Sequence, residues 1–306
     1  MTFKAFFARS VALSLSIVML VVLSNVFMNE YGLFGKVEGR SIKIYGDERT
    51  SKYLLSFNYI PANFDGLLIG SSVSDNIDSK KFMCCRIYNA SINGATVAEL
   101  KILVYNVLAK RDLECVIVSL YPILTGSNEK QTSRMVPREY WGTLGSINTL
   151  DFYRRKILII QGRLHDYFDD YGRYNYNLRK EGGDSKGIIL QKVAVMKADE
   201  TITIDEGAYI ELGTLLKTLR ARRTKIFAYY HPIPAKCLTP YEASYRLYQN
   251  KISALFDSTD VVWDYNTDDF LDFRKDYTNY CDEIHLSVKG IDYITRDINV
   301  RLSKWL

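Results

Sequence analysis

Short and almost uninterrupted apolar runs recur along this chain, separated by stretches in which apolar residues have helical spacing. The runs are GLLI, CVIVSL, KIFAYY and TDVVW, at residues 66–69, 115–120, 225–230 and 259–263. Helical patterns such as VAELKILVYNVLAK and YIELGTLLKTLRARR lie between them. Strands that are apolar on both faces are expected where helices cover both faces of a parallel sheet. The sequence therefore predicts an α/β fold, a three-layer α/β/α sandwich around a mostly parallel sheet.

An earlier apolar run, residues 11–28, carries no charge and is about long enough to cross the hydrocarbon core of a bilayer. It predicts one N-terminal transmembrane helix. Lys4 and Arg9 precede the run and Glu30 follows it, so the positive-inside rule predicts a cytoplasmic tail at residues 1–10 and export of the remainder. A cleaved signal peptide is the alternative. The segment SNVFMNEYG has no small-x-small cleavage site, which favours an uncleaved signal anchor.

The exported part is expected to consist of a stalk and one domain. Residues 29–60 show little periodicity and are interpreted as a stalk with one short helix. Residues 61–306 are expected to form the α/β domain, since a hydrophobic content of 47% is sufficient for a sizeable core. A polar segment rich in Tyr and Arg, residues 127–200, interrupts the alternation of strands and helices. We interpret it as a helical insertion that forms a lid or a substrate wall.

Charge and cysteine usage narrow the range of ligands. The net charge of +5 comes from scattered Lys and Arg, without the continuous basic stripe that nucleic-acid binding requires, so no nucleic acid is expected. No Cys/His spacing is typical of zinc, and neither a metal nor an organic cofactor is expected. The chain has five cysteines. A disulfide from Cys84 or Cys85 to Cys237 or Cys281 is one interpretation, and buried free thiols are the other.

Polar side chains suited to nucleophilic catalysis lie near both ends of the domain. Ser71 and Ser72 follow the first strand, at the edge of a parallel sheet where ligands bind. An N-cap for a helix beginning near Ser74 is the alternative role of either serine. Far along the chain, Asp282 precedes His285 by three residues, so its carboxylate can accept the imidazole Nδ1–H. Nε2 is then free to take a proton from a serine hydroxyl, which predicts a Ser-His-Asp triad.

These segments resemble the SGNH (GDSL-type) hydrolase superfamily over residues 65–290. In that superfamily the nucleophile follows the first core strand and an Asp-x-x-His lies near the C-terminus. IGSS matches the Gly-Asp-Ser motif with Ser71 in place of the acid, which makes Ser72 the matching nucleophile. DEIHLS matches the last block, which implies that His285 is the general base and Asp282 its orienting acid.

The oxyanion-binding blocks match the superfamily in part. YNASINGAT resembles the second block, whose glycine, here Gly94, would offer its N–H to an oxyanion beside the N–H of Ser72. The third block, Gly-x-Asn-Asp, is missing, because the chain reads VSLYPIL after the corresponding strand. The superfamily's oxyanion asparagine is therefore absent. Support for the oxyanion or the substrate is expected from nearby polar side chains: Ser71, Asn93, Ser119, Tyr121 and His231.

The resemblance also implies a function. The GSS variant, the missing asparagine and the anchor are similar to the membrane-attached branch that includes proteins of alginate O-acetylation and teichoic-acid D-alanylation. This implies an extracytoplasmic, membrane-anchored serine acyl esterase or O-acyltransferase, with acetyl as the expected group, that acts on a cell-surface or exported polysaccharide through an acyl-serine. Implied partners are the glycan or acylated polymer, the lipid bilayer and a multi-span membrane O-acyltransferase. The alternative is a non-catalytic glycan-binding or scaffold subunit of a polysaccharide-modification or export complex.

Overall fold

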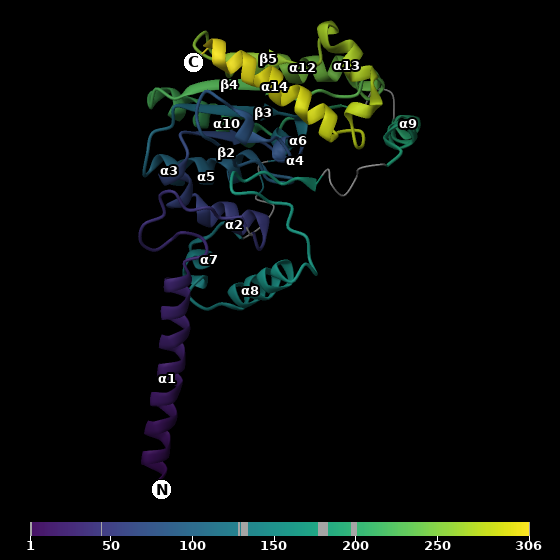
Figure 1. The fold of residues 1–306 in the computed structure, drawn as a ribbon. Helices are drawn as coiled ribbons and strands as arrows, with labels where there is room; N and C mark the ends of the chain where they lie inside the picture. Colours follow the sequence, from purple (N-terminus) through teal and green to yellow (C-terminus); the bar gives the residue numbers. More distant parts are fainter. Residues whose placement is uncertain are drawn as a thin grey trace.

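The computed structural model describes residues 2–43, 45–127, 129, 134–176, 183–196 and 201–305. Figure 1 shows a domain built on a sheet, with one long helix, α1, projecting from it. The sheet is parallel and has the order β2-β1-β3-β4-β5. Its strands, in chain order, are Gly66–Ile69, Ile87–Asn89, Cys115–Leu120, Lys225–Tyr230 and Val261–Asp264. Helices cover both faces, so the predicted three-layer α/β architecture is confirmed.

The helices of the described residues range from single turns to the long N-terminal helix. In chain order, α1 to α14 are Phe3–Met28, Glu48–Leu55, Tyr59–Asn63, Ser72–Asp75, Val97–Leu108, Pro122–Thr125, Pro137–Gly142, Ile147–Ile160, Ser185–Val195, Glu206–Ala221, Ala235–Leu238, Glu242–Ser253, Leu271–Lys275 and Val288–Trp305. Short 3₁₀ turns lie at Ser79–Lys81, Thr239–Tyr241, Asp268–Phe270 and Tyr277–Asn279.

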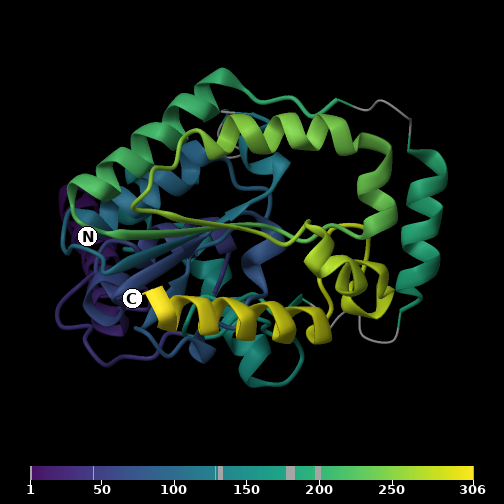
Figure 2. The same cartoon turned by 90° about the horizontal axis from the view of Figure 1, so that it is seen from above.

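The two helical layers are distinct when the sheet is seen edge-on. Helices α10 and α12 lie on one side of the sheet and α14 lies on the other (Figure 2). Helix α5 packs beside α10, where the Tyr105 and Thr218 hydroxyls are 3.2 Å apart. Local signals start these helices. Thr96 and Glu99 form a capping box at the start of α5, and the Asp205 side chain accepts the Ala208 N–H at the start of α10.

Strand order reverses beside β1. Both β2 and β3 pair with β1, so that Gly66 lies opposite Ile87 on one side and Cys115 on the other. Loops leaving the carboxyl ends of β1 and β3 therefore diverge to opposite faces of the sheet, which opens the usual ligand site of such folds. The sequence analysis did not identify β2, which has three residues and is too short to carry a pattern of its own.

The segment expected to form a stalk is instead part of the domain. Residues 29–60 contain α2 and the start of α3, and several of their apolar side chains belong to the same core as the sheet. Tyr45, Leu55 and Ile60 are fully buried. Tyrosine and aliphatic side chains dispersed without helical or strand periodicity supply this burial, which explains why the sequence pattern indicated an independent stalk.

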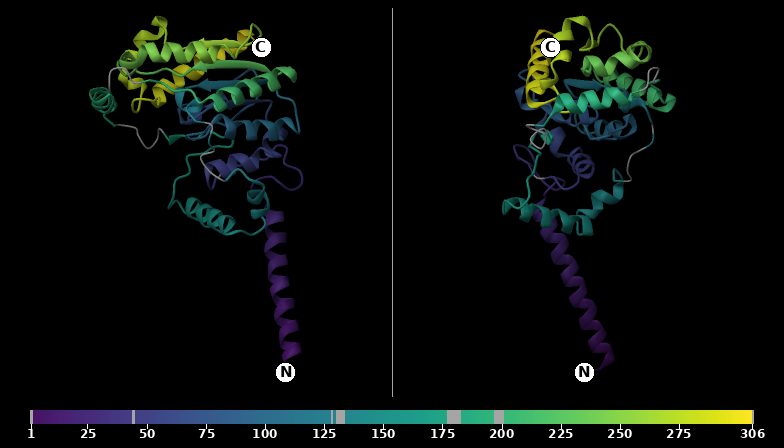
Figure 3. Two further views of the ribbon diagram at one scale, coloured as in Figure 1. Left: turned by 180° about the vertical axis from the view of Figure 1, so that it is seen from behind. Right: turned by 90° about the vertical axis from the view of Figure 1, so that its right-hand side faces the viewer.

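Helix α1 extends further toward the N-terminus than the apolar run that predicted it. It is 26 residues long, has a mean hydropathy of 2.4 over its most apolar window, and only 6% of that window is buried. Figure 3 shows it projecting away from the domain in two further views. Its length and composition suit a membrane span, although a signal sequence has the same features.

The cysteines are all free thiols. Cys85 Sγ lies 3.3 Å from Cys115 Sγ and 3.7 Å from Cys84 Sγ, at the amino ends of β2 and β3. Gly66 makes room for this cluster, because a Cβ at that position would lie 2.8 Å from Cys115 Sγ. The structure therefore agrees with the interpretation of the cysteines as free thiols and contains no disulfide among them.

Candidate active site

Ser72 lies at the switch point of the sheet, as the first residue of α4 immediately beyond β1. Gly70 permits the tight turn into this helix, since a Cβ there would lie 2.8 Å from Ser119 Cβ. Ser71 occupies the N-cap position but its side chain makes no capping hydrogen bond. Ser72 is 8% exposed, and its backbone N–H belongs to the first helical turn, where amides lack intrahelical partners.

His285 and Asp282 complete a chain of hydrogen bonds that begins at Ser72. The Ser72 Oγ lies 3.0 Å from His285 Nε2, and both Asp282 carboxylate oxygens lie 2.9 Å from His285 Nδ1. Asp282 Oδ1 also accepts the backbone N–H of His285 at 2.7 Å. The carboxylate thus fixes Nδ1 as the donor toward Asp282, and Nε2 faces the serine hydroxyl as the acceptor. The structure brings together the three side chains predicted as a triad.

Tyr176 covers the imidazole of His285. The two rings meet edge-on with centroids 5.1 Å apart, and the Tyr176 hydroxyl donates to the Ser72 carbonyl oxygen at 3.3 Å. Burial raises the pKa of Tyr176 well above its ordinary value, so the hydroxyl stays protonated. Tyr176 comes from the 127–200 segment, which was expected to supply a lid or wall. The rest of that segment contributes α7, α8 and α9, and residues 128, 130–133, 177–182 and 197–200 lie outside the described part.

His231 lies behind the triad and is fully buried. Its Nε2 lies 2.9 Å from the carbonyl oxygen of Ile284, the residue before His285. Because a carbonyl only accepts, Nε2 carries the proton. Burial lowers the pKa of His231 to about 3, so the ring is neutral. His231 therefore supports the loop that carries His285. The sequence had suggested that His231 supports the substrate or the oxyanion directly, but its side chain is buried away from solvent.

The amides proposed for the oxyanion lie on adjacent loops. Ile92 N–H donates to the Gly70 carbonyl oxygen at 3.1 Å, which holds the 90–94 loop against the end of β1. Gly94 has a φ of 62°, a conformation that favours glycine. Among the described residues, no acceptor is found for the backbone N–H of Gly94 or of Ser72.

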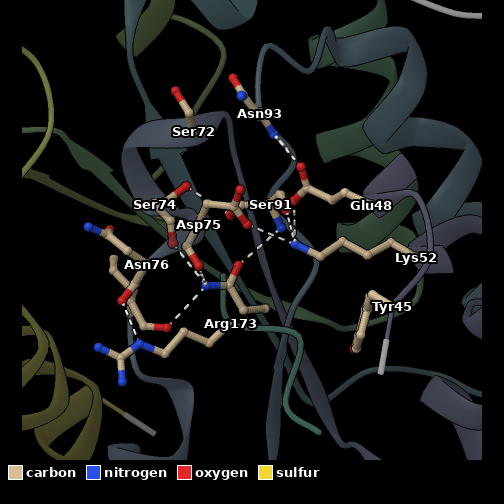
Figure 4. Close-up of polar contacts among 12 residues, drawn as sticks. Tyr45, Glu48, Lys52, Ser72, Ser74, Asp75, Asn76, Ser91, Asn93 and Arg173 are labelled. Carbon is tan, nitrogen blue, oxygen red and sulfur yellow. Dashed lines mark hydrogen bonds and ion pairs between the residues drawn. The ribbon is translucent and has the colours of Figure 1, made fainter. Parts of the chain in front are cut away.

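The other predicted donors differ in their access to this site. Asn93 is exposed, and Figure 4 shows it on the same side of the charged network as Ser72. Ser119 is buried beneath Gly70, beside Tyr229. Tyr121 packs its ring edge-on against the buried His231, with centroids 6.0 Å apart. Of these three side chains, only Asn93 is exposed.

A buried charged network lies beneath the two loops (Figure 4). Lys52, from α2, is fully buried, and its Nζ lies 2.8 Å from Asp75 Oδ1 and 3.1 Å from Glu48 Oε1. The same ammonium donates to the Ser91 carbonyl oxygen. Burial alone would lower the pKa of Lys52, but the Asp75 and Glu48 carboxylates raise it, so the ammonium is charged.

This network connects both loops of the site. Asp75 is on α4, three residues after Ser72, while Ser91 precedes the 93–94 loop. Glu48 Oε2 accepts the backbone N–H of Asn93 at 3.3 Å. Sequence reasoning missed Lys52, Glu48 and Tyr176, because the first two lie in the supposed stalk and the third is one of many tyrosines. No local signal in the sequence identifies them.

Comparisons with known proteins do not assign this chain to a family. No family model and no curated protein matches it. Among solved structures, one match is described as "a putative platelet activating factor from Streptococcus pneumonia". It has a TM-score of 0.44 and 12% sequence identity, and the alignment covers 83% of this chain and 91% of that one. At this level of similarity, function has to be inferred from the side chains of the site.

Proposed function

We propose that this protein is a membrane-anchored, extracytoplasmic serine acyl esterase or O-acyltransferase of the SGNH-like type. The observation that carries the proposal is the hydrogen-bonded series from Ser72 Oγ through His285 to Asp282, with distances of 3.0 and 2.9 Å. A nucleophile, a base and an orienting acid within hydrogen-bond reach are the minimum for acyl transfer through serine.

In the acylation step, Ser72 Oγ attacks the carbonyl carbon of an acyl ester. His285 Nε2 takes the hydroxyl proton during the attack and then gives it to the departing alcohol oxygen. Asp282 does not take the proton. It holds Nδ1–H and stabilises the imidazolium that forms between the two transfers. The product of this half-reaction is an acyl-Ser72 and a free hydroxyl on the donor.

The developing oxyanion needs donors that already point at it. The Ser72 and Gly94 amides serve this purpose in our proposal, and the Asn93 side chain is the third donor. Removal of one such donor from a serine enzyme costs about two to three orders of magnitude in rate. The charged network of Lys52 and Glu48 supports this arrangement by holding the Asn93 backbone in place.

The second half-reaction decides between esterase and transferase. Attack on acyl-Ser72 by water, with His285 as the base, releases a carboxylic acid. Attack by a glycan hydroxyl transfers the acyl group to a polymer. Acetyl is the expected group and an exported or cell-surface polysaccharide the expected substrate, both implied by the family resemblance. The same family resemblance implies that a multi-span membrane O-acyltransferase would supply the acyl donor.

The anchor part of the proposal rests on α1. Residues 11–28 would cross the membrane, residues 1–10 would remain cytoplasmic, and the domain after residue 28 would lie in the periplasm or at the cell surface. The length and apolar exposure of α1 support a span. The charge asymmetry between Lys4 with Arg9 and Glu30 supports this orientation.

A scaffold or glycan-binding subunit is the second candidate. The observation that favours it is the absence of the superfamily's asparagine after β3, where Tyr121 and Pro122 stand. A fluorophosphonate probe distinguishes the two, because it labels only a serine activated as a nucleophile. We expect labelling of the full chain at Ser72, retained in Ser287→Ala and lost in Ser72→Ala. A folded protein that the probe leaves unlabelled would favour the scaffold.

A further inference from the structure

Helix α8 presents apolar side chains to solvent on one side. Ile147, Leu150, Ile157 and Ile160 are between 54% and 75% exposed. Their spacing of three, seven and three residues brings them onto one arc of the helix, which we call the α8 arc and which also includes the exposed Arg154. The opposite side is anchored in the domain through Phe152, which is buried. An amphipathic helix with an uncovered apolar side is unusual for a surface bathed in water.

Helix α8 is attached directly to the end of α1. Asn25, in α1, donates through Nδ2 to the Leu144 carbonyl oxygen at 3.1 Å and accepts from the Tyr153 hydroxyl at 2.8 Å. Lys156 and Glu30 form an ion pair at 2.5 Å. Figures 1 and 3 show α8 lying crosswise to α1 at the point where α1 meets the domain.

The α8 arc faces the same medium as the last apolar turns of α1. An open depression of about 550 Å³ is lined by Leu20 and Val21 from α1 together with Ile147 and Leu150 from α8. At a rise of about 1.5 Å per residue, Val21 lies about 10 Å before the end of α1 at Met28. The first half of the arc, Ile147 and Leu150, therefore lies at the depth of residues that belong to the apolar run of α1.

Basic side chains surround the end of α1 at a slightly higher level. A second open depression, of about 530 Å³, is lined by Met28 and by charged side chains: Glu30, Arg40, Lys43 and Lys156. Glu30 pairs with Lys156, so Arg40 and Lys43 are the cations left to face a ligand. Cations just beyond the end of an apolar span suit the phosphates of lipid headgroups. Apolar side chains at the depth of the span and cations at its end form the two-layer pattern of an interfacial helix.

We propose that α8 is a second membrane contact, a helix that lies in the lipid interface with the α8 arc among the upper acyl chains. The occupant of this surface is the bilayer, because the arc continues the apolar surface of α1 and ends at a cationic rim. The inference rests on the proposed anchor. It adds that the domain is held at a fixed tilt and height, and does not swing on a single helix.

Photo-crosslinking in the full chain tests this contact. A benzophenone amino acid is introduced at position 157 of α8, position 15 of α1 or position 210 of α10, and each protein is placed in nanodiscs of phosphatidylethanolamine and phosphatidylglycerol. Ile210 is 60% exposed and Leu15 is 62% exposed, so both match Ile157 in accessibility. We expect lipid adducts at positions 15 and 157, several-fold above the level at position 210.

The alternative outcomes are distinguishable. Adducts at position 15 with only background at position 157 overturn the contact of α8 and leave the anchor intact. Background at both positions overturns the anchor itself. An adduct of position 157 with a second protein in native membranes, in place of lipid, overturns the bilayer as the occupant. Because each probe replaces an exposed side chain, the fold is retained in all three proteins.

Discussion

His285 lies on a loop that two other side chains hold toward Ser72. Asp282 accepts the His285 backbone N–H from within the loop, and His231 bonds the Ile284 carbonyl oxygen from below. Asp282 also orients the ring. The position of His285 is thus determined by groups on two segments, its own loop just before α14 and the turn after β4.

The effects of removing Ser72 and of removing His285 on the rate of ester hydrolysis should not be additive. We expect Ser72→Ala and His285→Ala each to reduce ester hydrolysis by about four to six orders of magnitude, because the members of a triad act as a unit. The double variant should be about as slow as either single variant. Release of p-nitrophenol from a model ester measures this. Ser71→Ala is the control, and a loss there as large as in Ser72→Ala would contradict the assignment of the nucleophile.

Acid should destabilise the protein through His231. Its pKa in the folded state is about 3 and its ordinary value is 6.5, so between these values only the unfolded chain binds the proton. Stability is therefore complete above pH 6.5 and falls as the pH decreases, by about 3 kcal/mol at pH 4. Urea unfolding at pH 7 and pH 4 measures this change. The free energy of unfolding should fall less between these pH values in His231→Gln than in the parent protein. His165→Gln, at an exposed histidine, is the control. An equal decrease in the free energy of unfolding in His165→Gln, His231→Gln and the parent would refute the prediction.

Helices α2 and α4 are joined by a buried ion pair. Helix α4 has four residues and could not form alone, since isolated helices of that length are unstable in water. Lys52 links it to α2 and, through the Ser91 carbonyl oxygen, to the loop before Asn93. Ser72 and the loop that carries Asn93 and Gly94 thus share one support, which comes from α2, in the segment that follows α1.

Removal of the Lys52 ammonium should lower the stability of the protein. Lys52→Met leaves Asp75 buried without its cation, which typically costs about 3 to 5 kcal/mol. Lys52→Met/Asp75→Leu should recover part of the loss, because an apolar pair of similar volume is tolerated in place of a buried ion pair. The measurement is the urea midpoint of the full chain in detergent. Lys36→Met is the control at an exposed lysine, and an equal midpoint in Lys36→Met and Lys52→Met would show that the network has no such role.

Some parts of this architecture can be predicted from sequence and others cannot. Strands β1, β3 and β4 have continuous apolar runs because both of their faces are covered, and the half-buried edge strand β5 keeps a shorter run. The Asp282 to His285 spacing is local. In contrast, β2 is stabilised by its pairing with β1, and Lys52 depends on partners far along the chain. Contacts of that kind form between segments that only the folded sheet brings together. They produce no hydrophobic periodicity in the sequence.

The domain and α1, the proposed membrane anchor, form one continuous body. Helix α1 passes into residues 29–60, which are packed into the core, so there is no extended spacer between α1 and the sheet. The active site should therefore remain close to the membrane surface, within reach of substrates that are themselves held there. A polymer in transit or a lipid-linked glycan fits that location better than a freely diffusing ester.

Membrane topology follows from the same arrangement. Alkaline phosphatase fused after Leu306 should be active, because it folds only outside the cytoplasm, and green fluorescent protein at the same point should remain dark. The charge difference across α1 is the physical reason for this orientation. Exchange of Lys4 and Arg9 for Glu should lower the phosphatase signal. A bright fluorescent fusion with an inactive phosphatase would reverse the proposed orientation.

The distance along the chain between the triad members has a consequence for biosynthesis. Ser72 precedes His285 by 213 residues, and His285 follows the last strand of the sheet. Domains form as the chain emerges from its N-terminal end, so the serine leaves the ribosome long before its base has been translated. A nascent chain therefore holds an ordinary, unreactive hydroxyl. On the proposed mechanism, a chain terminated before His285 lacks the base and should be inactive.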